Sequence, residues 1–197
     1  MKRRDFIRHA LALGTALAVA PELAVKHWAE AAWQVGANLP GVAIQATHLQ
    51  FRSLTNRQQT DALIFHHIGN TNADVSAATV HQWHLANGWA GIGYHYLIRK
   101  DGTIEQGRPL DTVGAHCYGE NYHTVGINIV GNFEIAEPNA LQMRAAARLA
   151  AALCRLYGFM PSEQTIFGHR DFNATACPGE NLYVRLPELI QAARQLY

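Results

Sequence analysis

The sequence predicts an α/β domain in which a mixed central β-sheet is flanked by helices. Short apolar runs of strand length alternate with stretches of helical period, and the two kinds of segment are interspersed along the chain. The chain has 197 residues, of which 49% are hydrophobic and 16% are charged, which suits one folded domain with a sizeable core. No internal repeat or low-complexity segment interrupts this pattern.

Strands are expected where short runs are continuously apolar or alternate between apolar and polar residues. They are residues 43–52, 62–67, 93–99, 103–106, 124–131 and 164–168. The run over residues 43–52 alternates only loosely, which suits an edge strand. Residues 100–102, with the sequence Lys-Asp-Gly, predict a hairpin between two of the strands, because Asp-Gly favours a tight turn.

Helices are expected where apolar residues recur with a period near 3.6 and where capping residues flank the run. They cover residues 22–35, a segment from Asp74 or Ser76 to about Asn87, a segment from Pro138 to Gly158, and a segment from Pro187 to Tyr197. Proline favours the first position of a helix, and glycine favours the position just after its end.

The N-terminus resembles an export signal. The pair Arg3-Arg4 precedes Phe6-Ile7 and a mildly apolar stretch over residues 10–20. This order of basic, apolar and small residues is typical of a twin-arginine signal and predicts a periplasmic or exported protein. The alternative is an ordinary basic N-terminus on a cytoplasmic protein.

The sequence leaves the cleavage site open. Residues 18–20 suit a signal peptidase, but Pro21 disfavours cutting there, and residues 29–31 offer a second site. An uncleaved leader is the other alternative. We therefore divide the chain into residues 1–31 as the signal, residues 32–60 as an N-terminal extension with an edge strand, and residues 61–197 as the functional domain.

The charge distribution argues against a nucleic-acid-binding protein. The formal net charge is +1, and residues 1–20 alone contribute +3, so the remainder carries about −2. That remainder has no basic footprint for nucleic acid. No run approaches the ~20 apolar residues that a membrane-spanning helix needs, so no stable membrane span is expected.

Residues of zinc-ligand type occur at two places. His169 and Cys177 lie in a loop that Cys-Pro-Gly closes, and the apolar run over residues 63–65 leads into His66-His67. Imidazole and thiolate suit Zn²⁺, and three protein ligands with an open fourth position are typical of a hydrolytic site. Neighbouring strand residues point to opposite faces, so only one of His66 and His67 can face the metal, and spacing does not choose between them.

Four blocks of sequence, in one order, resemble the zinc-dependent N-acetylmuramoyl-L-alanine amidases of the type 2 class. This class includes peptidoglycan recognition proteins and bacteriophage lysozyme-type amidases. The blocks are residues 64–67, residues 88–98 with 101–102, residues 113–116 with 124–133, and residues 168–179. The resemblance implies a mixed α/β fold, Zn²⁺ as the cofactor, and peptidoglycan or muropeptides as the partners. The implied reaction cuts the amide between the lactyl group of N-acetylmuramic acid and the L-alanine of the stem peptide.

The resemblance also implies roles for single residues. It places the metal ligands at His66, the first histidine of its pair, and at His169 and Cys177. Tyr94 matches a tyrosine beside the metal, whose hydroxyl would contact the bound water or the oxyanion. Thr175 matches a threonine found in amidase-active recognition proteins and would assist the oxyanion by its hydroxyl.

Substrate contacts are implied at Gly88, Trp89, Arg108 and His116. Gly88-Trp89 and Arg108 match members that favour diaminopimelate-type peptidoglycan, and a guanidinium suits the extra carboxylate of that stem. His116 resembles a groove residue that contacts sugar or stem peptide, and it is the fallback ligand if His66 is not one. Asn128 departs from relatives that carry a glutamate as general base, because an amide cannot accept that proton.

Two other functions are weighed against the amidase. A peptidoglycan-binding module without turnover commonly lacks the cysteine ligand, so the presence of Cys177 favours catalysis. A zinc peptidase that cuts within the stem peptide is the second alternative. If Cys177 binds zinc, Cys117 and Cys154 could form a disulfide in the periplasm, but Cys154 lies in a helical stretch and is expected to be a buried free thiol.

Overall fold

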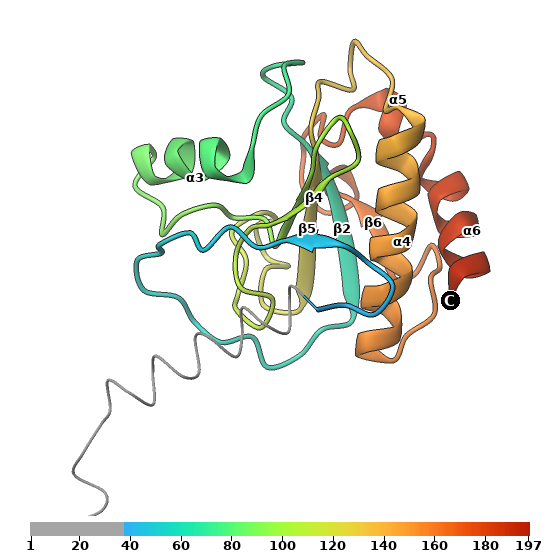
Figure 1. Cartoon of the computed structure of the whole chain (residues 1–197), viewed down its shortest axis with the longest axis horizontal. Coiled ribbons are helices and arrows are strands. Elements are labelled where there is room, and N and C mark those ends of the chain that lie inside the picture. Colours follow the sequence, from blue (N-terminus) through green and yellow to red (C-terminus); the bar gives the residue numbers. More distant parts are fainter. Residues whose placement is uncertain (1–37) are drawn as a thin grey trace, which may run out of the picture.

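A six-stranded sheet with the order β1-β4-β3-β5-β2-β6 forms the centre of the molecule (Figure 1). The computed structural model describes residues 38–197, so the predicted signal and the helix expected over residues 22–35 lie outside the described residues. The strands are β1 (Ile44–Gln45), β2 (Ala62–His67), β3 (Tyr96–Ile98), β4 (Ile104–Gln106), β5 (Thr124–Ile129) and β6 (Ile166–Gly168). Only the β3–β4 hairpin is antiparallel, and every other neighbouring pair is parallel. The sheet is therefore mixed, as the sequence predicted.

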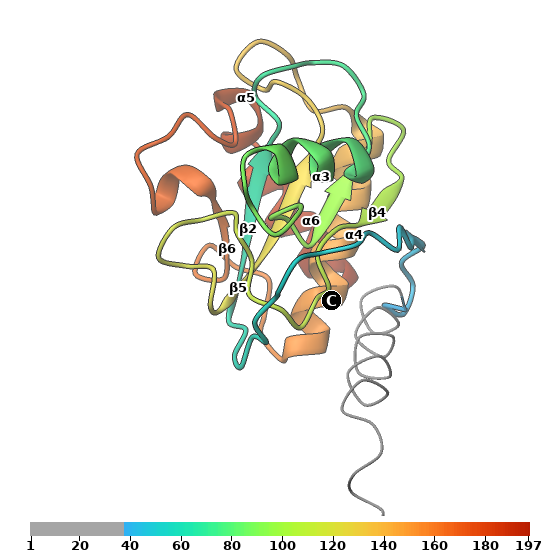
Figure 2. The ribbon, with the colours of Figure 1, turned by 90° about the vertical axis from the view of Figure 1, so that its left-hand side faces the viewer.

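Helices cover both faces of the sheet. Helix α3 (Ala77–Ala86) lies on one face, while α4 (Ala140–Tyr157) and α6 (Leu186–Leu196) lie on the other (Figures 1 and 2). The short helix α5 (Glu180–Tyr183), which the sequence did not predict, precedes α6. None of the helices within residues 38–197 is long and apolar enough to cross a membrane.

The alternation of strand residues separates the core from the candidate site. Leu63 and Phe65 of β2 are completely buried in the larger core, which lies between the sheet and the pair α4 and α6. A smaller core under α3 includes Val80 and Leu97. Because successive side chains alternate between faces, His66 lies on the α3 side of the sheet.

The helix ends follow from capping groups. The Ser76 side chain accepts from the backbone N–H of Thr79, as expected for a helix that begins at this point. The sequence prediction for α4 was wrong by two residues, because Asn139 caps it and Pro138 precedes the cap. Asn139 and Gln142 form a capping box, which satisfies free N–H groups of the first turn and stabilises the helix by about 1 kcal/mol.

The fold includes part of the segment that the sequence assigned to an extension. Strand β1 is only two residues long and pairs in parallel with β4 at the sheet edge. Phe51 packs against the smaller core, and Asn56 forms an isolated bridge with Thr112. The folded unit therefore begins before residue 61. Cys117 and Cys154 are both buried free thiols, as was expected for Cys154.

Candidate active site

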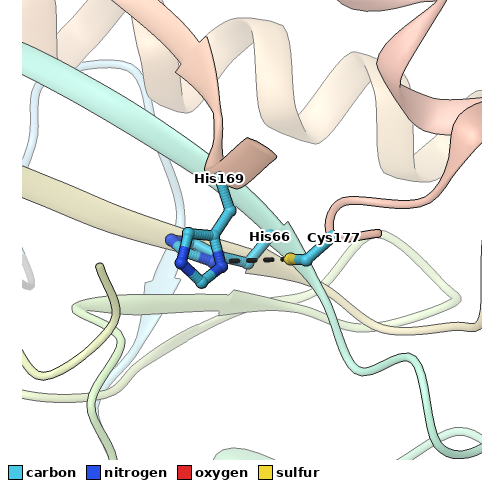
Figure 3. A group of neighbouring side chains, drawn as sticks. All are labelled: His66, His169 and Cys177. Carbon is cyan, nitrogen blue, oxygen red and sulfur yellow. Dashed lines mark hydrogen bonds between the residues drawn. The ribbon is translucent and has the colours of Figure 1, made fainter. Parts of the chain in front are cut away.

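Two neighbouring strands and one loop bring the three proposed ligands together (Figure 3). His66 lies near the end of β2, and His169 begins a short 3-10 helix directly after β6, the strand next to β2. The ligand atoms of His66, His169 and Cys177 all lie within 4.8 Å of one another. His66 Nδ1 is 3.6 Å from Cys177 Sγ, which suits two ligands of one tetrahedral ion with bonds of roughly 2.0–2.3 Å.

Hydrogen bonds within the loop hold Cys177 close to His169. The Asp171 carboxylate accepts a hydrogen bond of 2.8 Å from the N–H of Gly168, and this bond fixes the start of the 3-10 helix. The N–H of Arg170 donates to the carbonyl of Cys177 at 2.9 Å. Thr175 Oγ1 accepts from the N–H of Cys177 at 3.2 Å, so its own proton is free to donate. The exposed Thr175 hydroxyl therefore stands beside the cluster.

Burial sets the protonation of the cluster. It lowers the pKa of His66 well below the ordinary value, with smaller contributions from His116 and His169, and it also lowers the pKa of His169. Both imidazoles are therefore neutral at pH 7, which is the form that binds a metal. Burial raises the pKa of the Cys177 thiol to about 12, so this ligand must lose a proton when an ion binds. Two imidazoles and one thiol fit Zn²⁺.

His67 faces away from the cluster. Its Nδ1 accepts from the N–H of Phe133 at 3.2 Å, on the opposite face of the sheet from His66. Because side chains alternate along β2, His66 faces the site and His67 packs behind the sheet, as expected from their adjacent positions.

Tyr94 lies next to the cluster, with its ring centroid 5.1 Å from that of His66. Burial raises the pKa of its phenol, the nearby Cys177 raises it further, and Asn128 lowers it in part. The hydroxyl therefore keeps its proton at neutral pH and can act as a hydrogen-bond donor.

Asn128 lies beside His66 in the sheet. The two residues are register partners on β5 and β2, and Asn128 is completely buried. Neither polar atom of its side chain has a hydrogen-bond partner of ordinary geometry among the described residues. A buried carboxamide with so few partners is rare in a folded protein, and this one lies beside Tyr94, whose pKa it lowers through a side-chain hydrogen bond.

A groove extends from Tyr94 along α3. Its cavity of about 410 Å³ is lined by Ile68, Asn70, Val80, Trp83, His84, Ala86, Asn87 and Tyr94. Gly88 follows α3 with a φ of +82°, a conformation that favours glycine. Trp89 is 43% exposed, and its ring centroid lies 4.5 Å from that of His84, which lines the groove. Trp89 thus packs on His84 of the groove without lining the cavity itself, whereas Gly88 supplies the turn.

Arg108 does not reach the groove. It is buried, and its guanidinium donates to the carbonyls of Ile92 at 2.9 Å and Val113 at 2.8 Å. Burial lowers its pKa to about 10. The structure therefore makes Arg108 an internal tie between the segment that carries Tyr94 and the loop that carries His116, in place of the carboxylate contact expected from the sequence.

His116 is also placed differently from the expectation. Only 7% of the residue is exposed, and it lies behind His66, with Nδ1 of His116 3.0 Å from Nε2 of His66. It is outside the ligand cluster and does not line the groove. The structure thus gives it neither the role of a groove contact nor that of a fallback ligand.

Sequence reasoning missed Asn173 altogether. Its Oδ1 accepts from Nε2 of His169 at 3.0 Å and from the N–H of Tyr118 at 3.1 Å, and its amide donates to the carbonyl of Tyr118 at 3.1 Å. His169 Nε2 therefore carries the proton, and Nδ1 keeps its lone pair. The only signal in the sequence was the position of Asn173, four residues after a proposed ligand.

Comparison with known proteins finds related sequences. The endolysin of Enterobacteria phage K11 is 36% identical over 146 residues, which cover 71% of this chain and 95% of the endolysin. Peptidoglycan-recognition protein SC2 of Drosophila melanogaster is 33% identical over 128 residues, which cover 61% of this chain and 68% of that protein.

A solved structure is similar to this chain in fold. The endolysin N-acetylmuramoyl-L-alanine amidase LysCS of Clostridium intestinale superposes with a TM-score of 0.70 at 29% identity, over 79% of this chain and 98% of the other. Residues 56–180 match the family described as N-acetylmuramoyl-L-alanine amidase. This match covers all three residues of the His66, His169 and Cys177 cluster, and it shows that the chain belongs to the N-acetylmuramoyl-L-alanine amidase family.

Proposed function

We propose that this protein is a zinc-dependent hydrolase of the amide bond between N-acetylmuramic acid and L-alanine in peptidoglycan. The observation that carries the proposal is the convergence of His66, His169 and Cys177 within 4.8 Å, beside Tyr94. Two neutral imidazoles and one thiol suit Zn²⁺ and leave a fourth position for water or substrate. Amidase relatives among the phage endolysins support the reaction class.

A bound zinc ion would polarise the carbonyl of the substrate and activate a water at neutral pH. The residues of the chain supply the rest. His66, His169 and Cys177 hold the ion, and the protonated hydroxyl of Tyr94 donates to the oxygen on which negative charge develops. Thr175, whose proton is free because its oxygen accepts from Cys177, donates from the loop side.

Proton handling differs from a site with a carboxylate base. Asn128 stands next to His66, where some relatives carry a glutamate, and its carboxamide cannot take a proton. Its carboxamide, which lies beside Tyr94, can orient a water or a substrate carbonyl. Tyr94 is the group that we assign to relay a proton: its hydroxyl would give a proton to the leaving amine and take back the proton that the attacking water loses.

The groove along α3 is the proposed position of the stem peptide. It begins at Tyr94 and is lined by Trp83 and His84, which offer aromatic surface and a polar edge. The predicted preference for a diaminopimelate stem depended on Gly88-Trp89 and on Arg108, and the buried guanidinium of Arg108 removes one of these two supports. The proposal therefore makes no choice between stem types, and both are to be compared.

A binding module without turnover is the second candidate, since peptidoglycan-recognition proteins are among the relatives. The complete ligand cluster, including Cys177, favours catalysis. A peptidase that cuts within the stem would need the same ion but a different placement of the scissile bond. The products distinguish the three functions.

The test is a digest of peptidoglycan analysed by mass spectrometry. Stem peptides that begin at L-alanine, lost on chelation and restored by Zn²⁺, are the expected products. Cys177→Ala should abolish them, while Cys154→Ala, in the core of α4, should retain activity and serves as the matched control. Internally cut peptides would instead identify a peptidase, and wall binding without products would identify a recognition module.

We also propose that residues 1–31 direct export to the periplasm or beyond. The pair Arg3-Arg4 before an apolar stretch supports this. The test is a fusion of residues 1–31 to a reporter that is scored only after export. Arg3→Lys with Arg4→Lys should stop export, and export that survives this change would contradict the twin-arginine assignment.

A further inference from the structure

The ring of His116 is held in a tight slot. Gly114 and Gly126 flank it so closely that a Cβ on Gly126 would come to 2.5 Å from the ring, and a Cβ on Gly114 would come closer still. Such distances are far inside van der Waals contact. Gly126 lies on β5, next to β2, so the slot is part of the sheet itself. The orientation of the His116 ring is therefore fixed by the backbone.

A chain of hydrogen bonds runs through this ring. His66 Nε2 and His116 Nδ1 are 3.0 Å apart, His116 Nε2 and Thr124 Oγ1 are 3.4 Å apart, and Thr124 Oγ1 donates to the carbonyl of Glu120 at 2.7 Å. The chain thus starts at a proposed metal ligand and ends at a main-chain carbonyl, which can only accept.

The Glu120 carbonyl at the end of this series of hydrogen bonds determines the direction of each bond in it. Since the Thr124 hydroxyl gives its proton to the Glu120 carbonyl, its oxygen accepts from His116 Nε2. The buried ring nitrogens of His116 face Thr124 Oγ1 and His66 Nε2 and no carboxylate, so the ring carries its one proton on Nε2 and its Nδ1 accepts from His66 Nε2. His66 then keeps a lone pair on Nδ1, the atom that faces Cys177 Sγ at 3.6 Å.

We propose that His116 is a positioning residue for the metal site, which selects the tautomer and ring orientation of His66 so that Nδ1 faces the ion. The inference rests on the proposed function, because it takes His66 to be a zinc ligand. Partners of this kind behind a metal-binding histidine commonly contribute about 10- to 100-fold in metal affinity. His116 acts through His66 and does not touch the substrate.

A matched pair of variants tests this role. In His116→Asn the amide oxygen replaces Nδ1 as the acceptor, whereas in His116→Gln the amide is displaced by one methylene and reaches the Nε2 position instead. Both variants are polar and smaller than histidine, so packing losses are similar. His48→Asn, at an exposed residue with a φ of +50° that asparagine tolerates, is the control.

The measurement is the Kd for Zn²⁺ by competition with a chelator, on folded protein stripped of metal. The expected result is a Kd raised about 10- to 100-fold in His116→Gln, and a Kd within a few-fold of the unchanged protein in His116→Asn and His48→Asn. Equal Kd values for His116→Gln and the unchanged protein would overturn the inference. Absence of zinc binding by the unchanged protein would instead refute the proposed function.

Co²⁺ replaces Zn²⁺ for a readout that does not depend on turnover. The visible absorption of Co²⁺ reports ligand geometry, and we expect it to change in His116→Gln and to be preserved in His116→Asn. Thermal unfolding of the metal-stripped proteins identifies any loss of folding. If His116→Gln fails to fold, Thr124→Val, which removes the acceptor of His116 Nε2, takes its place with a weaker Kd expected, and an unchanged Kd overturns the inference.

Discussion

Zinc binding should release about one proton per ion at pH 7, and the structure assigns that proton to Cys177. Burial raises the pKa of this thiol to about 12, whereas burial lowers the pKa values of His66 and His169, which are already neutral at pH 7. The gap of about five pH units between 7 and 12 means that deprotonation costs roughly 7 kcal/mol of apparent zinc affinity. Affinity should therefore rise about tenfold per pH unit between the lowered histidine pKa values and the thiol pKa.

Isothermal titration calorimetry in buffers of different ionisation enthalpy counts the protons. Cys177→Asp is the matched variant, because a carboxylate is already ionised at pH 7 and should release no proton. Release of two or more protons by the unchanged protein would show that a histidine is protonated before zinc binds. Equal proton release by the unchanged protein and Cys177→Asp would refute the assignment to the thiol.

Three further predictions follow from the site. Tyr94→Phe should lower kcat about 10²- to 10³-fold while the bound zinc, measured by elemental analysis, stays constant, and an unchanged kcat would exclude the hydroxyl from catalysis. Asn173→Ala should weaken zinc binding about tenfold in a chelator competition, because His169 loses the acceptor that fixes its tautomer, and Asn173→Asp should restore it. Burial lowers the pKa of His116 from 6.5 to about 3. As the pH falls below 6.5, this histidine is protonated in the unfolded chain but stays neutral in the folded protein, so its contribution to stability is lost. Metal-stripped protein should thus lose about 2 kcal/mol of unfolding free energy from this residue between pH 7 and pH 5, measured by urea unfolding, and equal values at the two pH values would contradict its burial as a neutral ring.

Elements with a strong local signal were predictable from the sequence. The apolar run of β2, the Asp-Gly turn of the β3–β4 hairpin, the Ser76 cap of α3 and the proline in the first turn of α6 all lie where expected. The misses have local causes as well. Helix α5 is too short to show a period, and the capping box at Asn139 outweighs the preference of Pro138 for the first turn.

The site was predictable in residue type but not in the surroundings of each residue. Imidazole and thiol groups identified the ligand cluster, because metal chemistry restricts the choice. Arg108 and His116 were assigned to the substrate because the family resemblance implies contacts at these positions. Their burial depends on carbonyls and rings from distant segments: the partner of His116 on β2 lies 50 residues away. No local pattern records such a contact.

The loop over residues 114–123 contacts both proposed histidine ligands, although it supplies none of the proposed ligands. His116 meets His66 from one end of the loop, and the backbone of Tyr118 holds Asn173, which in turn meets His169. Asn121 Oδ1 ties the loop together by accepting from the N–H groups of His116 and Cys117 at 2.8 and 3.1 Å. The proposed ligand histidines come from β2 and from the residue that follows β6, so the sheet fixes their positions, while this loop fixes the orientation of their rings. The groove is separate from this loop, because its lining residues come from α3 and from the segments that carry Ile68 and Tyr94.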